Sequence, residues 1–294
     1  MIGFALLLLA QAGPPPPPPL HGGPATMTCP VGGESFEALQ SSHYSTTGRR
    51  PDGRPHSYWY MPLPIPECPS NGLVVFRDFS PEEVGTLESL IASDAYRAMV
   101  ADDSTYYRAQ WLATRLGLPE KEALGLLLAA TWQVKPEDGP TGQPLPSPER
   151  ARRYQEEFVR RVMALPADPQ DAEYVGLHAR AANAQRELGR FDEAAAMLRQ
   201  IVGWSSAGDQ SGWSRFAEQL LPAVERQDGA VEPLDLADEV RLPWLCMDED
   251  RPQSAYDRTL CGRPDVQARI AENLRRREQA AQRESAAPAS SEDQ

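Results

Sequence analysis

One stretch in the second half of the chain limits the fold more than any other, because small and apolar residues recur in it at helical spacing on both sides of a Leu-Gly pair. The stretch covers residues 178–200, and the pair is Leu188-Gly189. Glycine readily adopts the left-handed conformation that ends many helices. Ala181 and Ala194 leave room for two helices to approach closely. The pattern predicts an antiparallel helical hairpin.

A second stretch, residues 106–124, has the same form with Leu116-Gly117 at its centre. Helical spacing of apolar residues continues on both sides of it. Ser80-Pro-Glu-Glu83 has the residues of a helix start with a capping box. We therefore predict a mainly α-helical protein. The predicted helices are 81–92, 93–100, 103–116, 119–133, 147–164, 169–188, 191–202, 213–226 and 264–283.

Paired helices joined by a Leu-Gly turn resemble the tetratricopeptide repeat (TPR) family. The resemblance implies stacked hairpins with a concave face that binds other proteins and carries out no chemistry. We expect a non-catalytic protein-interaction or scaffold protein whose partner is a protein or a peptide. Side chains on the outward face of the first helices would hold the peptide backbone or its carboxylates. The residues predicted for this role are Arg108, Arg115, Asn183 and Arg186.

The charge of the chain narrows the range of partners. Its 294 residues include 29 Lys and Arg against 42 Asp and Glu, which gives a formal net charge of -13. Nucleic acids are bound largely through basic side chains that displace counterions, so we expect no nucleic-acid partner. The apolar run at the N-terminus is shorter than the roughly 20 residues that span a bilayer, and we expect no transmembrane segment in the mature chain.

That apolar run, residues 1–12, ends in Ala10-Gln-Ala12, the small-residue pattern of a signal-peptide cleavage site. It favours a signal peptide and a periplasmic or secreted protein. Residues 13–27 follow as a proline-rich linker that contains Pro14–Pro19. The alternative is a cytoplasmic protein that starts at Met27.

The four cysteines, Cys29, Cys68, Cys246 and Cys261, allow two disulfides in three connectivities. We predict the pairs Cys29–Cys68 and Cys246–Cys261, because each pair lies within one segment of the chain. In the cytoplasm the same residues would be reduced thiols.

Residues 28–79 are rich in glycine, proline and aromatic residues, and they predict a small β-rich module. Its expected strands include Ser57–Met61 and Leu73–Phe76. The module contains the pattern Cys-Pro-x-x-Gly twice, at Cys29–Gly33 and at Cys68–Gly72.

These two segments resemble zinc knuckles, and the chain resembles an uncharacterised bacterial family in which a zinc-ribbon-like module with two Cys-Pro-x-Cys-Gly knuckles precedes TPR-like helices. Here Gly32 and Asn71 replace the second cysteine of each knuckle. The resemblance implies an architecture and no activity, with a degenerate metal site whose two remaining thiols form a disulfide. The residues that carry it are Cys29, Pro30, Gly33, Asp52, Pro62, Leu63, Cys68, Pro69, Gly72, Asp78 and Phe79.

The chain lacks the common catalytic motifs. Its four histidines do not have the His-x-x-x-His spacing, and there is no Gly-x-Ser-x-Gly. We therefore predict no catalytic residue, no enzyme activity and no cofactor. The alternative is a zinc-binding module or a metal-dependent enzyme formed by Cys29, His43, His56 and Cys68.

The predicted organisation has six parts. They are a signal peptide (1–12), a proline-rich linker (13–27), a β-rich, degenerate zinc-ribbon-like module (28–79), a TPR-like helical domain (80–228), a C-terminal loop with a capping helix (229–283) and a disordered tail (284–294).

Overall fold

The structure is a computed structural model that describes residues 21–57, 61–135, 147–205, 211–251 and 253–286. The predicted signal peptide lies outside these ranges. Most of the predicted linker and the end of the predicted tail lie outside them as well.

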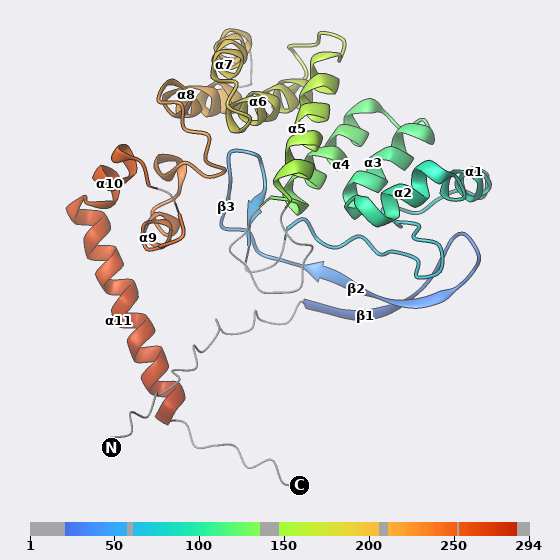
Figure 1. Cartoon of the computed structure of the whole chain (residues 1–294), viewed down its shortest axis with the longest axis horizontal. Helices are drawn as coiled ribbons and strands as arrows, with labels where there is room; N and C mark the ends of the chain where they lie inside the picture. Colours follow the sequence, from blue (N-terminus) through green and yellow to red (C-terminus); the bar gives the residue numbers. More distant parts are fainter. Residues whose placement is uncertain (1–20, 58–60, 136–146, 206–210, 252, 287–294) are drawn as a thin grey trace, which may run out of the picture.

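The described part of the chain is mainly helical and begins with short antiparallel strands, as predicted. Figure 1 shows α1 to α8 following one another along an arc, with the strands and their loops on one side of it. The helices are α1 (Pro81–Ile91), α2 (Asp94–Asp102), α3 (Thr105–Arg115), α4 (Glu120–Gln133), α5 (Pro148–Met163), α6 (Ala172–Glu187), α7 (Phe191–Ser205), α8 (Ser211–Glu225), α9 (Arg241–Cys246), α10 (Ala255–Cys261) and α11 (Pro264–Ala286).

From α3 to α8, each helix packs against the next one in the sequence. Both predicted hairpins are present, as the pairs α3–α4 and α6–α7. The first helix of each pair ends at a glycine with a positive φ, +77° at Gly117 and +76° at Gly189. The Arg190 N–H then donates to the Gln185 carbonyl oxygen (2.9 Å), and an equivalent backbone hydrogen bond ends α3. The Leu-Gly signal therefore marked both turns correctly.

The start of α1 also follows its sequence signal. The Ser80 hydroxyl accepts from the Glu83 N–H (3.2 Å), and the Glu83 carboxylate accepts from the Ser80 N–H (2.8 Å). This reciprocal pair satisfies two of the backbone donors that a helix leaves open at its N-terminus.

The strands differ from the prediction. An antiparallel ribbon joins β1 (His21–Thr28) to β2 (Ser35–His43), and a shorter one joins β3 (Gly48–Arg49) to β4 (Pro55–His56). Residues 21–27 were expected to be linker because of their Gly and Pro content, but a ribbon edge tolerates proline. The predicted strand Leu73–Phe76 is reduced to one bridge between Glu67 and Val74. Part of the other predicted strand, Ser57–Met61, lies outside the described residues.

Three groups of buried apolar residues hold these elements together. The largest is formed by residues of the helices from α4 to α8 and includes Phe158, Leu198 and Leu220, each 0% exposed. The second surrounds the Cys29–Cys68 disulfide and joins the N-terminal module to α1, α2 and α3. The third is small and surrounds Leu234, Leu245 and Cys261.

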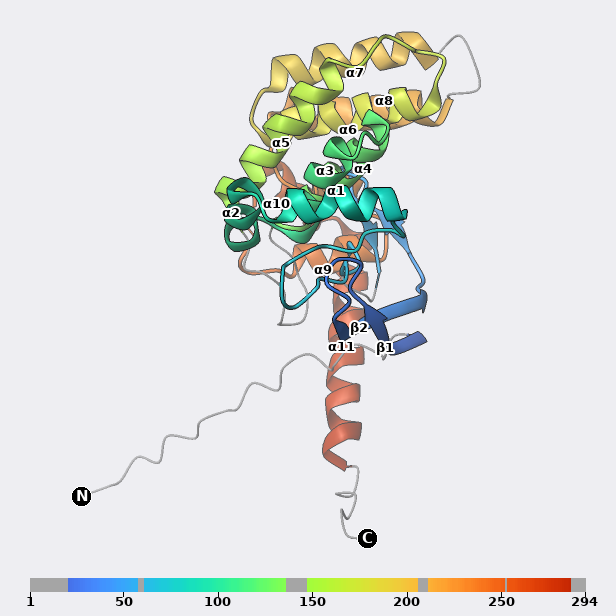
Figure 2. The same ribbon diagram turned by 90° about the vertical axis from the view of Figure 1, so that its right-hand side faces the viewer.

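The C-terminal segment contains two helices that the sequence analysis did not predict, α9 and α10. They have six and seven residues, which is too short for a clear helical period. Helix α11 was predicted, and it extends away from the rest of the molecule (Figures 1 and 2).

Both predicted disulfides are present. The Cα atoms are 5.6 Å apart in Cys29–Cys68 and in Cys246–Cys261. The first links two loops of the N-terminal module, and the second joins the ends of α9 and α10.

Replacing the cysteines in pairs should separate the contributions of the two disulfides. Cys29→Ser with Cys68→Ser opens the longer loop and should lower the free energy of unfolding by about 4 kcal/mol, against about 3 kcal/mol for the Cys246 and Cys261 pair. Urea unfolding with and without a reductant measures both values. If the reductant leaves the unfolding of the wild-type protein unchanged, the disulfides do not stabilise the fold.

Candidate functional site

Helix α3 was predicted to hold a peptide, and it holds a segment of its own chain. The Arg108 guanidinium donates to the Gly72 carbonyl oxygen (2.8 Å) and forms a two-pronged ion pair with Glu67 (2.9 and 2.8 Å). The Tyr106 hydroxyl donates to the Leu63 carbonyl oxygen (2.9 Å). Arg108 is buried, and it is not part of a free binding surface.

Helix α6 repeats this arrangement with the segment that follows α8. The Arg186 guanidinium donates to the carbonyl oxygens of Asp228 (2.6 Å) and Ala230 (2.7 Å). The Asn183 side-chain oxygen accepts from two nitrogens of Arg186 (3.1 and 2.9 Å). Both residues are 0% exposed. Part of the predicted chemistry, arginine binding extended backbone, therefore occurs inside the molecule, and Asn183 binds the side chain of that arginine.

The predicted peptide-binding set is thus corrected. Arg108, Asn183 and Arg186 are buried, and only Arg115 stays on the surface, with its guanidinium 3.5 Å from the centre of the Trp111 ring. The helical period identified the correct helix faces. It could not show that segments near residues 63–72 and 228–230 fold back over them.

The two Cys-Pro-x-x-Gly segments have the same backbone structure. The Gly33 N–H donates to the Cys29 carbonyl oxygen (3.2 Å), and the Gly72 N–H donates to the Cys68 carbonyl oxygen (2.9 Å). Both glycines have positive φ, 68° and 70°. Asn71, at the place of a missing knuckle cysteine, donates to the Val31 carbonyl oxygen (3.0 Å) and contacts the Cys29 sulfur (3.7 Å).

The described side chains of the zinc alternative, those of Cys29, His56 and Cys68, do not form a metal site. Cys29 and Cys68 are joined to each other, and zinc binds the thiolate form. His56 lies 3.2 Å from the Glu232 carboxylate. The side chain of His43 is outside the described part. Within the described ranges, no group of three or more His, Cys, Asp or Glu residues is placed to hold a metal ion.

The turn between β3 and β4, Arg50-Pro-Asp-Gly-Arg54, is the most buried polar part of the N-terminal module. The Asp52 carboxylate accepts from the Arg50 guanidinium (3.3 and 2.9 Å) and from the Arg54 N–H (3.1 Å). All three side chains are buried, at 6% exposure or less.

Helices α4 and α6 hold this turn in place. The Trp132 indole donates to the Asp52 carbonyl oxygen (3.2 Å), and Arg180 donates to the Pro51 carbonyl oxygen (2.7 Å). Lys135, just beyond α4, pairs with Asp52 (2.9 Å) and with Glu187 (2.8 Å).

Glu187 extends the set of buried charges into the helical layer. Its carboxylate accepts from Asn183 (2.7 Å) and from Gln155 (2.7 Å). Burial alone raises the pKa of Asp52, but the charges of Arg50 and Lys135 outweigh it and hold that pKa well below its usual range. Asp52 is therefore ionised in the folded protein, and its charge is matched. We call Arg50, Asp52, Lys135 and Glu187 the buried ion network.

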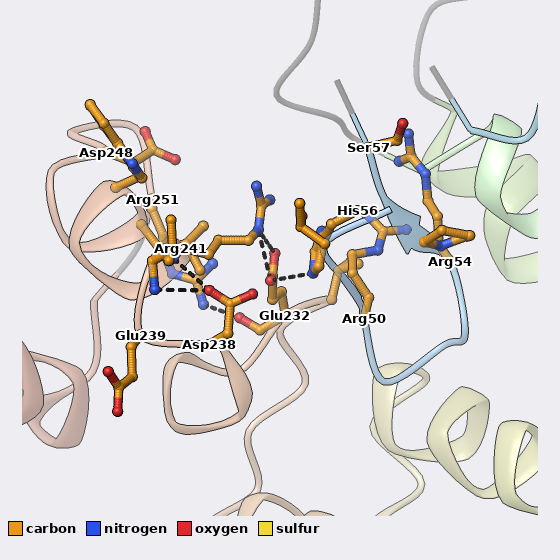
Figure 3. Close-up of a pocket in the computed structure, with 16 residues that line it drawn as sticks. Arg50, Arg54, His56, Ser57, Glu232, Asp238, Glu239, Arg241, Asp248 and Arg251 are labelled. Atoms are coloured by element: carbon orange, nitrogen blue, oxygen red, sulfur yellow. Dashed lines mark hydrogen bonds and ion pairs between the residues drawn. The ribbon is translucent and has the colours of Figure 1, made fainter. Parts of the chain in front are cut away.

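Next to this turn lies a cavity of about 830 Å³, which we call the cleft. One wall is the β3–β4 hairpin, with Arg50, Arg54 and His56, and the other is formed by residues 231–251. Figure 3 shows the Glu232 carboxylate between the two walls, where His56 contacts it at 3.2 Å and Arg241 donates to it at 2.8 Å.

The charges of the cleft are fixed by bonds within the protein. Burial raises the pKa of Glu232, but hydrogen bonding to His56 and the charge of Arg241 outweigh it and lower that pKa overall. Asp238 accepts from the N–H groups at the start of α9, and Glu239 pairs with Arg269 (2.6 Å). The Ser57 hydroxyl donates to the Ser45 carbonyl oxygen (2.8 Å). The cleft thus offers ordered charges of both signs.

A histidine oriented by a carboxylate also occurs in enzymes, where a nucleophile completes the site. In the described lining of the cleft, Thr47 and Ser57 carry hydroxyls, and the Ser57 hydroxyl donates to a backbone oxygen.

The sequence analysis did not identify the residues of the cleft apart from His56. A turn signal was visible in Pro51-Asp-Gly53, but its partners are distant in sequence. Lys135 lies 83 residues from Asp52, and no local pattern relates them.

No family model matches the chain, and no similar curated protein or solved structure was found. None of the helices in the described ranges is long and apolar enough to cross a membrane.

Replacing the central carboxylate tests the buried ion network. Asp52→Asn leaves Arg50 and Lys135 without their shared counter-charge and should lower the free energy of unfolding by about 3–5 kcal/mol. The same change at the exposed Asp250 is the control and should alter it by less than about 0.5 kcal/mol. Urea unfolding at pH 7 measures both.

The pH dependence gives an independent prediction for the same variant. Because the pKa of Asp52 is lowered in the folded state, its stabilisation is complete above the unfolded pKa of about 3.9 and is lost below it. The difference in unfolding free energy between wild type and Asp52→Asn should therefore shrink by about 1 kcal/mol from pH 5 to pH 3. A difference that stays constant over this range contradicts the assignment.

Two glycine substitutions test how closely α6 holds the turn. Gly53 and Gly189 both have positive φ (+90° and +76°), so alanine is strained at either site. At Gly53, a Cβ would also lie 2.8 Å from the Arg180 Nε, whereas nothing lies within 4 Å at Gly189. Gly189→Ala should cost about 1–2 kcal/mol, and Gly53→Ala about 1–3 kcal/mol more. Equal losses in thermal unfolding would show that the turn and α6 are not in close contact.

Proposed function

We propose that this chain is a non-catalytic protein-interaction or scaffold protein that binds a segment of a protein or peptide partner in the cleft between the β3–β4 hairpin and residues 231–251. One observation carries the proposal. The cleft presents fixed charges of both signs, and Val240, which lines it, is 74% exposed.

The arrangement of charges supports a peptide as the ligand. Arg50, Arg54 and His56 lie on one wall, and the other wall carries charges of both signs, Asp238, Glu239 and Asp248 together with Arg241 and Arg251 (Figure 3). Complementary charges set the orientation of a bound chain more than its affinity, and an exposed apolar side chain supplies area to bury.

The helical layer supports the same class of function. Consecutive paired helices suit a TPR-like architecture, and their first helices bind extended backbone of this chain through Arg108 and Arg186. Because those faces are covered, the partner is assigned to the open cleft. No cofactor is part of the proposal.

We also infer that the N-terminal module is related to the zinc-ribbon-like modules that it resembles. The two equivalent Cys-Pro-x-x-Gly turns support this relation, with the Cys29–Cys68 disulfide in the place of a metal ion.

The two disulfides are consistent with an oxidising compartment. We therefore propose export to the periplasm or beyond. Alkylation of thiols in intact cells before lysis tests this. A protein whose cysteines are already paired as disulfides in the cell should gain no label. Labelling of all four cysteines would place the chain in a reducing compartment.

Site-specific photo-crosslinking tests the cleft as a binding site. A benzophenone amino acid at Val240 should give a discrete adduct in cells, since its side chain lines the cleft. The matched control is Met163, which is also apolar and exposed (54%) but lies at the end of α5, outside the cleft.

Adducts from Val240 alone support the proposal. Adducts of the same mass from both positions indicate nonspecific contact, and adducts from Met163 alone place the partner elsewhere. Either result contradicts binding in the cleft.

A further inference from the structure

A second, smaller cavity of about 140 Å³ lies on the β3–β4 turn, where Arg50 contributes to both cavities. It is distinct from the cleft, because its other lining residues come from α6, α8 and the segment after α8. Its lining contains three arginines and no acidic residue. The lining residues are Arg49, Arg50, Pro51, Arg180, Phe216, Gln219, Leu220 and Leu236.

Arg180, which is half-buried, differs from the buried cations Arg50, Lys135 and Arg186. Arg50 and Lys135 each pair with a carboxylate, and Arg186 makes four hydrogen bonds to its neighbours. Arg180 donates one hydrogen bond, to the Pro51 carbonyl oxygen (2.7 Å). Among the described residues, no carboxylate lies within ion-pair distance of it.

The position of the Arg180 guanidinium is nevertheless fixed. It lies 5.1 Å from the centre of the Trp213 ring and 4.9 Å from that of Phe216. Aromatic faces attract a cation but do not neutralise it. Burial lowers the pKa of Arg180 to about 10, and the nearby Asp52 offsets this only in part. The protein therefore keeps a partly desolvated positive charge in a fixed place at the cavity.

We propose that this cavity binds a small carboxylate ligand that carries a short apolar group. The guanidiniums of Arg49 and Arg180 bind the carboxylate, and the apolar group packs on Phe216, Leu220 and Leu236.

The lining selects this class of ligand over a multiply charged anion. Half of the lining residues are apolar, namely Pro51, Phe216, Leu220 and Leu236. Placing the second charge of a phosphate dianion against such a wall is unfavourable because the charge loses its hydration. A monocarboxylate makes charge-assisted contacts with the arginines and leaves its apolar part for the wall.

Isovalerate and its neutral analogue isovaleramide are the probes. Isovalerate should raise the thermal midpoint of the full-length protein by roughly 3 °C at about ten times its Kd, whereas isovaleramide at the same concentration should not. Arg49→Gln should weaken isovalerate binding about tenfold in calorimetric titration, because one charge-assisted contact is lost. The exposed Arg199→Gln is the matched control and should bind as the wild type does.

A second variant tests the site by adding a charge to it, without removing an arginine. Gln219 is exposed at the edge of the cavity, so Gln219→Glu supplies a carboxylate within the protein. It should raise the thermal midpoint and abolish isovalerate binding, while Gln200→Glu on α7 adds the same charge elsewhere and should do neither.

Three results would overturn the proposal. They are equal effects of isovalerate and isovaleramide, tighter binding of inorganic phosphate than of isovalerate, and unchanged isovalerate binding in Gln219→Glu.

Discussion

The rest of the structure depends on the buried carboxylate of Asp52. It binds Arg50 within its own turn and Lys135 beyond α4, and Lys135 in turn binds Glu187 of α6. A buried charge is tolerated only when partners replace the water that it loses. Because Lys135 and Glu187 belong to the helical layer, the charges are fully matched only when the N-terminal module is docked on that layer.

This constraint explains why both cavities lie beside the same turn. The turn fixes Arg50, Arg54 and His56 on one wall of the cleft, and Arg49 and Arg50 at the smaller cavity. The bond from Arg180 to the Pro51 carbonyl oxygen belongs to the same docking contact. The wall that the turn contributes to each cavity is therefore ordered by the docking contact.

Helices α1 to α8 and α11, the two hairpin turns and the disulfides could be predicted from the sequence, because each has a local signal. Leu188-Gly189 ends a helix, Ser80 and Glu83 cap one, and cysteines close in sequence pair readily. Which segment covers each helix face could not be predicted. The period that identified Arg108 and Arg186 as outward residues of their helices is the same whether a foreign peptide or the chain itself covers them. The cleft and the buried ion network bring together residues that are far apart in the sequence, and nothing local in their sequence relates them.

A double-mutant cycle between Asp52→Asn and Lys135→Met tests the central claim most directly. If the turn is held on the helices by this ion pair, the losses in unfolding free energy should be strongly non-additive, with a coupling of about 2 kcal/mol. Losses that add to within about 0.5 kcal/mol would show that the two residues act independently, and that the docking of the module has another origin.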